Sequence, residues 1–298
     1  MRGFKTIKKQ PTQPQSQPQY EVADVLNKLG SKLEDLGLNS WQLRTLFALK
    51  KCRTSALGGH IDACDECGNI SISYNSCRNR HCPKCQGRNR EDWIQTRETE
   101  LLPVPYFHVV FTLPEVLNKT ALHEPKMLYD ILFESAWETL QTFGKNKNLQ
   151  MGMIAVLHTW GQNLSLHPHL HCIVPGGGVD ENGAWKNIKN DGKFLFSVKA
   201  LSKVFRAKFC EKLKANLKDK FNENQENEYE KIRQSLWEKP WVVYAKKPFG
   251  SPKSVVEYLG RYTHKIAISN QRIRKIDAET VTFSYKDYRQ KGIKKQMV

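Results

Sequence analysis

The side chains best suited to chemistry in this sequence are cysteines and histidines crowded into one short segment. Six of the eight cysteines lie between residues 52 and 85. Two C-x2-C pairs stand out there, and each such pair brings two thiolates to one side of a tight turn. Zinc binds four soft ligands in a tetrahedron. The spacing therefore predicts a first, structural zinc site made by Cys64, Cys67, Cys82 and Cys85.

The remaining members of the cluster form a second possible ligand set of two thiols and two imidazoles. Cys52, His60, Cys77 and His81 would then make a second, interleaved zinc site, although scattered residues of these types are often buried thiols and surface histidines. Cations surround the second C-x2-C pair, which suits contacts to a DNA backbone; the alternative is a solvated helix face. These candidate DNA-binding residues are Arg78, Arg80, Lys84, Arg88 and Arg90.

The segment HPHLHCIV, residues 167–174, has the alternation of a β-strand. Alternate residues of a strand share a face, so His169 and His171 should point one way and Leu170 and Cys172 the other. Two imidazoles about 7 Å apart on one face can hold a divalent ion. Taken alone the pattern is weak, because two half-exposed histidines would look the same.

Tyrosines at helical spacing form the third candidate group. Gly250-Ser251-Pro252 is a typical helix start, and Tyr258 and Tyr262 then lie one above the other. Paired aromatics at this spacing are usually core residues, but Val255, Val256 and Leu259 already supply an apolar face. A phenol has a pKa near 10 and becomes a nucleophile beside a metal ion and a cation. Arg261 and Lys265 are the neighbouring cations.

The elements that must position these groups are mixed helices and strands without a regular alternation. This favours an α+β fold with an antiparallel sheet. The sequence predicts a disordered tail over residues 1–20, a helical and zinc-binding DNA-binding domain over 21–102, and a second, larger domain over 103–298. Helices are expected over 88–102, 125–143, 199–221 and 252–265, strands over 106–113, 153–160, 169–174, 241–246 and 281–286, and a solvated loop over 222–230.

Composition narrows the class of protein. The 298 residues are 39% hydrophobic and 26% charged, which excludes a disordered or collagen-like chain. The net charge of +17 indicates a polyanionic partner, with nucleic acid as the first choice. No apolar run reaches the length of a membrane span, and the first residues lack the apolar core of an export signal. We therefore expect a cytoplasmic, nucleoid-associated protein whose cysteines are reduced.

Together these features resemble one family closely, the two-tyrosine HUH rolling-circle transposases of the IS91 (insertion sequence ninety-one) type. The resemblance covers most of the chain from Leu46 onward and does not include the first 20 residues. The matching segments are YNSCRNRHCPKCQ (74–86), PYFHVVFTLP (105–114), LHTWGQNLSLHPHLHCIVPGGG (157–178), KPFGSPKSVVEYLGRYTHKIAISNQRI (247–273) and VTFSYKDY (281–288).

The resemblance implies roles for the candidate residues. His169 and His171 would hold Mg²⁺ or Mn²⁺, Tyr258 and Tyr262 would be the nucleophiles, and the zinc module would assist binding to the ends of the element. The domain over 103–298 would be an HUH endonuclease whose core is a ferredoxin-like (RRM-like) antiparallel sheet, with the histidines on a central strand and the tyrosines on a helix facing it. For the third protein ligand our candidate is His158, because its strand should pair with the histidine strand. Gln162 and His108 are alternatives, and we interpret His167 as a second-layer or DNA contact.

The expected function is that of a DNA transposase, which nicks and rejoins single-stranded or hairpin ends of an insertion sequence through a 5′-phosphotyrosine. The host replication machinery would be a further partner. Two alternatives remain: a replication initiator or relaxase-like nickase, and a catalytically inactive zinc-dependent DNA-binding regulator. Members of the resembled family continue past the KDY segment, whereas this chain stops at Val298, so a truncated or compact copy is expected.

Overall fold

The computed structural model describes residues 17–188, 195–217, 223–246, 252–263, 266–287, 290 and 292–298. Contacts divide the chain into two compact units, one made of Met1–Cys77 and Ile268–Val298 and the other of Arg78–Ala267. The expected boundary after residue 102 differs from this division. The helix before that boundary packs within the second unit, and the last strands belong to the first.

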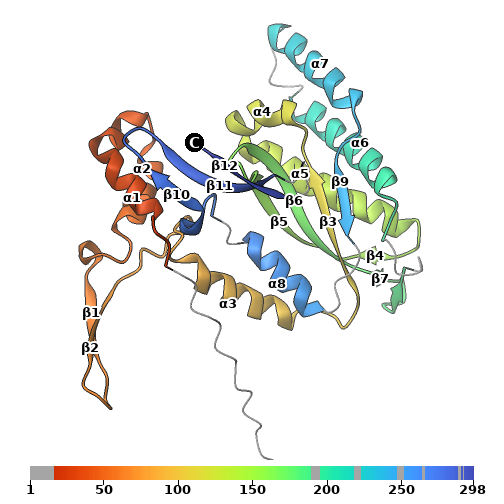
Figure 1. Ribbon diagram of the computed structural model, residues 1–298. Coiled ribbons are helices and arrows are strands. Elements are labelled where there is room, and N and C mark those ends of the chain that lie inside the picture. Colours follow the sequence, from red (N-terminus) through yellow and green to blue (C-terminus); the bar gives the residue numbers. More distant parts are fainter. Residues whose placement is uncertain are drawn as a thin grey trace, which may run out of the picture. The chain divides into compact units, whose positions relative to one another are not determined.

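The second unit contains a four-stranded antiparallel sheet, among the described residues, in the order β5-β6-β3-β9. Along the chain its elements follow the order β-α-β-β-α-β, and the third strand, β6, is central. This is the ferredoxin-like arrangement, so the predicted α+β fold is confirmed (Figure 1). The six elements are β3 (Tyr106–Thr112), α5 (Pro125–Lys145), β5 (Ile154–Trp160), β6 (Leu166–Pro175), α6 (Val198–Leu217) and β9 (Val243–Lys246).

One face of this sheet is covered by α5 and α6. Both helices place apolar residues at intervals of four, such as Leu128 and Leu132 on α5 and Phe205 and Phe209 on α6. These pack on the alternate strand residues Val109, Phe111, Leu170, Cys172 and Val174, all of which are fully buried. The alternation in the histidine segment thus has a physical cause, because one side of β6 supplies the main core while the other side carries His169, His171 and Ile173.

The opposite face of the sheet packs against helix α8 (Pro252–Thr263), which contacts β3, β5 and β6. Helix α3 (Gln86–Thr99) lies beside α8 in this same unit (Figure 1). A smaller apolar cluster joins these parts through Ile94 of α3, Ile173 of β6, and Val255, Val256 and Leu259 of α8. Helix α3 therefore shares an apolar core with the sheet of the second unit.

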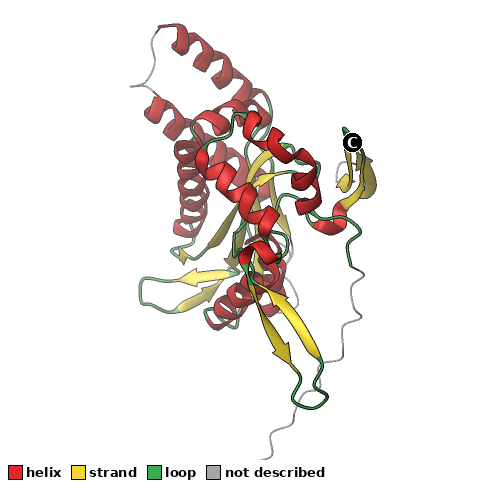
Figure 2. Cartoon of the chain, turned by 90° about the vertical axis from the view of Figure 1, so that its left-hand side faces the viewer, coloured by secondary structure: helices red, strands yellow, loops and turns green. Residues whose placement is uncertain are grey.

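The first unit begins with α1 (Val22–Leu29), the 3-10 helix η1 (Gly30–Leu36) and α2 (Ser40–Lys51). A hairpin of β1 (Gly59–Ala63) and β2 (Ile70–Tyr74) follows; it is labelled in Figure 1, and in Figure 2 it is the yellow two-stranded ribbon that points downward and ends in a loop. The C-terminal strands β10 (Ile273–Ile276), β11 (Val281–Asp287) and β12 (Ile293–Met297) form an antiparallel sheet. Asn270 ties this sheet to α1, since its Oδ1 accepts a hydrogen bond from the backbone N–H of Val22 at 3.0 Å.

Several short elements complete the chain: the 3-10 helices η2 (Ser55–Leu57), η3 (Glu115–Leu117) and η4 (Asn270–Arg272), helix α4 (Asn118–His123), and strands β4 (Gln150–Met151), β7 (Gly177–Val179) and β8 (Trp185–Asn187). The predicted loop over 222–230 is wrong, because residues Glu223–Glu238 form helix α7. Leu236, near the C-terminal end of α7, is buried in the main core. Tertiary packing therefore stabilises a helix that the polar sequence of its first turns does not predict. No described helix has the length and hydropathy that a bilayer span requires.

Candidate active site

Three histidines from two neighbouring strands converge on one point in the second unit. His169 and His171 lie on β6, and His158 of β5 is the direct register partner of His169. Nε2 of His169 lies 3.1 Å from Nδ1 of His158 and 3.1 Å from Nε2 of His171. All three side chains are buried. The structure thus brings together the two histidines of the HUH pair and the histidine that the sequence favoured as a third ligand.

The nitrogens of this histidine cluster (His158, His169 and His171) are spaced as ligands of one ion would be. Nitrogen ligands about 2.1 Å from an ion and at right angles to each other lie about 3.0 Å apart. Nδ1 of His169 lies within hydrogen-bond distance of the backbone carbonyl of His167, so it must donate there. A neutral imidazole has only one N–H, which leaves a lone pair on Nε2 of His169 at the meeting point. A buried cation would stabilise that lone pair, and the donor set fits a divalent metal.

A fourth histidine, His108 of β3, lies behind the histidine cluster. Its Nε2 is 2.9 Å from Nδ1 of His171, and the two rings are stacked with centroids 5.1 Å apart. Burial, with a smaller contribution from the positive charge of Lys246, lowers the pKa of His108 to about 4. His108 is therefore neutral at physiological pH. The sequence offered His108 as an alternative third ligand. In the structure its Nε2 lies next to Nδ1 of His171, whereas Nε2 of His171 is the nitrogen that faces His169.

Tyr258 reaches the same region from α8. Its ring meets that of His108 edge-on, with centroids 5.0 Å apart and planes inclined by 68°. Tyr258 is half-buried. Tyr262 follows one turn later on the same helix, but its side chain, like that of Arg261, lies outside what the structure describes, and so does Lys265.

Two further residues named in the sequence lie in or next to the segment that joins β5 to β6. The ring of His167 is 5.0 Å from that of His169, and its backbone carbonyl accepts from His169 as described above. Gln162 is half-buried in the turn that joins β5 to β6. Trp160 was not among the predicted site residues. Its ring packs edge-on against that of His158, with the ring centroids 4.8 Å apart. Its place at the end of β5, in phase with His158, was the signal that could have identified it.

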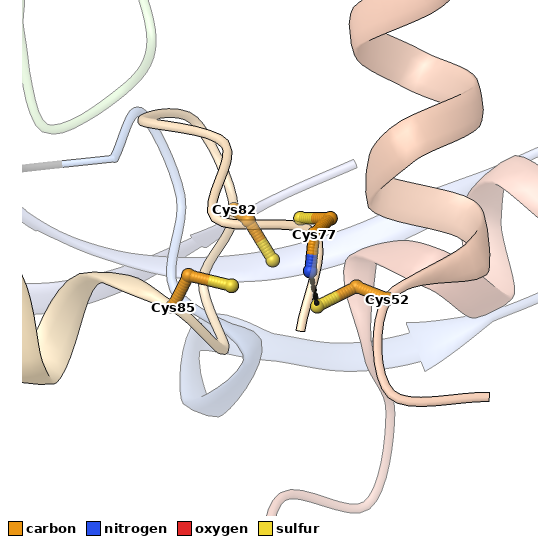
Figure 3. Close-up of side chains that lie close together, drawn as sticks. All are labelled: Cys52, Cys77, Cys82 and Cys85. Carbon is orange, nitrogen blue, oxygen red and sulfur yellow. Dashed lines mark hydrogen bonds between the residues drawn. The ribbon is translucent and has the colours of Figure 1, made fainter. Parts of the chain in front are cut away.

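Four cysteines form a second cluster of possible ligands. The sulfur atoms of Cys52, Cys77, Cys82 and Cys85 lie within 4.8 Å of one another, and their side chains gather around one small space (Figure 3). The backbone N–H of Cys77 points at Sγ of Cys52 at 3.5 Å. Cys52, Cys82 and Cys85 are buried. Four thiolates in a closed group are a ligand set that structural zinc prefers.

The structure groups these cysteines differently from both predicted sets. It joins Cys52 and Cys77 from the second predicted set with Cys82 and Cys85 from the first. Cys64 and Cys67 are exposed at the turn between β1 and β2. The hairpin is paired from Gly59↔Tyr74 to Ala63↔Ile70, and four residues of strand span about 14 Å, so pairing carries this turn away from the hairpin base.

The two histidines of the second predicted set are exposed and lie outside the cysteine group. His60 sits near the base of the hairpin, with Nε2 3.7 Å from the carboxylate of Asp62. The backbone N–H of His81 donates to Oδ1 of Asn79 at 2.9 Å. Among the predicted DNA contacts, Arg78, Arg80 and Arg90 are exposed and Lys84 is half-buried, while the side chain of Arg88 lies outside the described part of the chain.

The sequence matches two known protein families. Residues 24–113 match the family described as "Transposase zinc-binding domain", and residues 152–298 match the family described as "Putative transposase". The chain is 43% identical over 282 residues to "Putative transposase y4qJ" of Sinorhizobium fredii, covering 90% of this chain and 71% of that protein. It is 29% identical over 267 residues to "Transposase for insertion sequence element IS801" of Pseudomonas savastanoi pv. phaseolicola, covering 86% of this chain and 63% of that protein.

Solved structures give a weaker likeness. A structure of TrwC with a 27-mer DNA that comprises a recognition hairpin and cleavage site aligns with a TM-score of 0.30 and 17% identity, over 36% of this chain and 44% of that one. The conjugative relaxase TrwC with mutant OriT DNA aligns with a TM-score of 0.29 and 13% identity, over 64% of each chain. Scores this low establish neither fold nor function.

The sequence relatives, by contrast, decide the family. A protein that is 43% identical and is covered over 71% of its length is described as "Putative transposase", and both family matches agree with that description. The buried group of four cysteines fits the zinc-binding domain, and the convergent histidines lie in a ferredoxin-like core. The chain therefore belongs to the IS91 family of transposases, with an N-terminal zinc-binding domain.

Proposed function

We propose that this transposase nicks and rejoins single-stranded DNA at the ends of an insertion sequence through a 5′-phosphotyrosine, in rolling-circle transposition. One observation carries the proposal: three buried imidazole nitrogens converge on one point, and Tyr258 on the facing helix contacts His108, whose ring is stacked on His171. The chain spans 71% and 63% of its two relatives, so the activity of a complete transposase is part of the proposal.

The residues that would hold the catalytic ion are His158, His169 and His171, and we propose Mg²⁺ or Mn²⁺ as that ion. Magnesium prefers oxygen ligands, so three imidazoles favour manganese of the two. When bound, the ion would withdraw charge from the oxygens of the scissile phosphate. His169 is held for this task by the carbonyl of His167, because that hydrogen bond fixes its proton on Nδ1 and turns Nε2 inward.

The nucleophile in this proposal is Tyr258, with Tyr262 as the second. The phenolic oxygen attacks phosphorus and loses its proton, the P–O3′ bond breaks, and the departing 3′ oxygen gains a proton. The DNA 5′ end is then joined to tyrosine, which conserves the energy of the phosphodiester for rejoining. A second tyrosine on one helix would allow the same chemistry at the other end of the element.

Zinc and the cationic residues complete the proposal. We assign the zinc ligands as Cys52, Cys77, Cys82 and Cys85, because they form a closed, buried thiol group. Exposed Arg78, Arg80 and Arg90 would contact the phosphate backbone, and the net charge of +17 supports such a partner. Action on nucleoid DNA in the cytoplasm follows from this function.

Covalent capture tests the proposed function. The protein is incubated with single-stranded oligonucleotides from the element ends and Mn²⁺, and then denatured and separated by electrophoresis. We expect a DNA adduct that survives denaturation, is lost in His169→Ala, and is lost in the double variant Tyr258→Phe/Tyr262→Phe. If wild-type protein binds the oligonucleotide but gives no adduct, it is a DNA-binding regulator and the proposed nuclease is absent.

A further inference from the structure

His108 lies between the histidine cluster and the proposed nucleophile. On one side its ring is stacked on His171, with the planes only 8° apart and Nε2 of His108 2.9 Å from Nδ1 of His171. On its other side the edge-on contact with Tyr258 joins it to α8. The side chain of His108 is only 3% exposed, so both contacts lie in the protein interior.

The proton between His108 and His171 decides whether His171 can bind a metal. A neutral imidazole has one N–H and one lone pair. If His171 donates from Nδ1 to Nε2 of His108, its own Nε2 has a lone pair directed at the meeting point with His169. If His108 donates instead, Nε2 of His171 carries the hydrogen and is no ligand. Metal-binding histidines usually donate their second N–H to a carboxylate or a carbonyl, and here an imidazole occupies that place.

We propose that His108 is a positioning residue, which accepts the Nδ1 proton of His171 to fix its metal-binding tautomer and holds the ring of Tyr258 beside the ion. The inference rests on the proposed nicking function and goes beyond it by assigning the coupling between ligand and nucleophile. An imidazole acceptor adds no negative charge, whereas a carboxylate would add one to a buried site that must bind a phosphodiester.

Two substitutions separate the two halves of this role. His108→Phe keeps an aromatic ring against Tyr258 but removes the acceptor. His108→Gln keeps a carbonyl oxygen near the position of Nε2 but removes the ring. Mn²⁺ binding is measured from the electron paramagnetic resonance signal of the free ion, which requires no catalysis. Adduct formation is then measured at saturating Mn²⁺, and thermal melting shows that each variant folds.

Each variant should impair one of the two measured quantities, Mn²⁺ binding or adduct rate, and leave the other nearly unchanged. His108→Phe should weaken Mn²⁺ binding about 10- to 100-fold, as is typical for loss of a group that orients a metal ligand. Its adduct rate should recover once the ion is saturating. His108→Gln should bind Mn²⁺ within a few-fold of wild type, yet lose about two- to tenfold in adduct rate because the aromatic contact is gone. His123→Phe, at an exposed histidine of α4, is the matched control and should change neither quantity.

The outcomes distinguish this inference from the proposed function. If His108→Phe binds Mn²⁺ as tightly as wild type, the positioning role is overturned, even where wild type forms adducts. If both variants lose Mn²⁺ binding and adduct rate equally, His108 does not separate the two contacts and the proposal also fails. If wild type forms no adduct while His108→Phe loses Mn²⁺, the nicking function fails and the role toward the metal ligand stands.

Discussion

A Cβ atom built on Gly260 would lie 2.6 Å from Cγ1 and 2.7 Å from Cδ1 of Ile94. At this point α8 packs tightly against α3, and any side chain at position 260 would have to displace that of Ile94. Ile94 is 7% exposed and belongs to the apolar cluster that includes Val255 and Leu259. Since Tyr258 lies two residues before Gly260 on α8, this contact also sets where the proposed nucleophile stands.

We expect Gly260→Leu to destabilise the second unit and to slow nicking. Overpacking of a tight core typically costs about 1–3 kcal/mol, and part of the strain should be relieved by moving α8 away from the sheet. The free energy of unfolding from urea titration and the adduct rate measure the two effects. Adding Ile94→Ala opens space at the contact and should restore part of both. Gly260→Leu with wild-type stability and adduct rate would show that the helices separate freely.

The cysteine group makes a prediction about zinc. Cys77→Ser should lose the ion bound by the four clustered cysteines, because three thiolates and a hydroxyl form a poorer set than four thiolates. Cys64→Ser, at the exposed hairpin turn, should keep that ion. Zinc content per chain by mass spectrometry and the melting temperature provide the readouts. Equal zinc loss in both variants would favour the grouping of Cys64 and Cys67 with Cys82 and Cys85.

The placement of the histidines followed from local rules. Alternation fixes the face of His169 and His171 within one strand, and a short turn makes β5 the partner of β6, which brings in His158. The ferredoxin-like order of the strands came from the family resemblance. The position of His108 could be read only after β3 was known to pair with β6, because that pairing joins residues more than 60 apart.

The cysteines are grouped differently in the structure for another reason. Residues 61–63 and 70–74 alternate between apolar and small or polar residues, which was a signal for a hairpin. The C-x2-C spacing alone does not take this hairpin into account. Its paired strands place Cys64 and Cys67 at the turn between β1 and β2, away from the hairpin base. Helix α7 gave no such signal in 222–230, since its stability comes from residues nearer its end, such as Leu236.

Thiol reactivity should divide the cysteines by burial. Burial strongly raises the pKa of the Cys172 thiol, and it raises that of Cys210 to about 11 despite the nearby charges of Arg206 and Arg233. The backbone N–H of Cys67 and then that of Glu66 lower the pKa of exposed Cys64. Because thiolate is the reactive form, iodoacetamide at pH 8 should label Cys64 quickly and leave Cys172 and Cys210 unlabelled.

Peptide mass spectrometry after timed labelling checks this division. In denaturant with a chelator, all eight cysteines should react, which confirms that the protected thiols are chemically intact. Raising the pH toward 11 should increase labelling of Cys210 before that of Cys172. Rapid labelling of Cys172 in native protein at pH 8 would mean that the sheet and its covering helices open readily.

Tyr244 makes the last prediction, which concerns DNA binding. It pairs with Val110 across β9 and β3, and Val110 pairs with His171 on the other side. Tyr244 thus shares the sheet face of the histidine cluster, two strands or about 10 Å away, and it is 52% exposed. An exposed aromatic ring on such a face can stack a base of single-stranded DNA, which typically contributes about 1–3 kcal/mol.

We therefore expect Tyr244→Ala to weaken binding of a single-stranded oligonucleotide by about five- to 150-fold, which corresponds to that range, whereas Tyr244→Phe should bind like wild type. Fluorescence anisotropy in the Tyr258→Phe/Tyr262→Phe background avoids covalent capture. Trp137→Ala is the matched control, because Trp137 is a partly exposed aromatic on α5, which covers the other face of the sheet. Stacking is not electrostatic, so the loss for Tyr244→Ala should persist as salt is raised. An equal loss for Trp137→Ala, or a loss for Tyr244→Ala that vanishes with salt, would rule out a base-stacking role for this face.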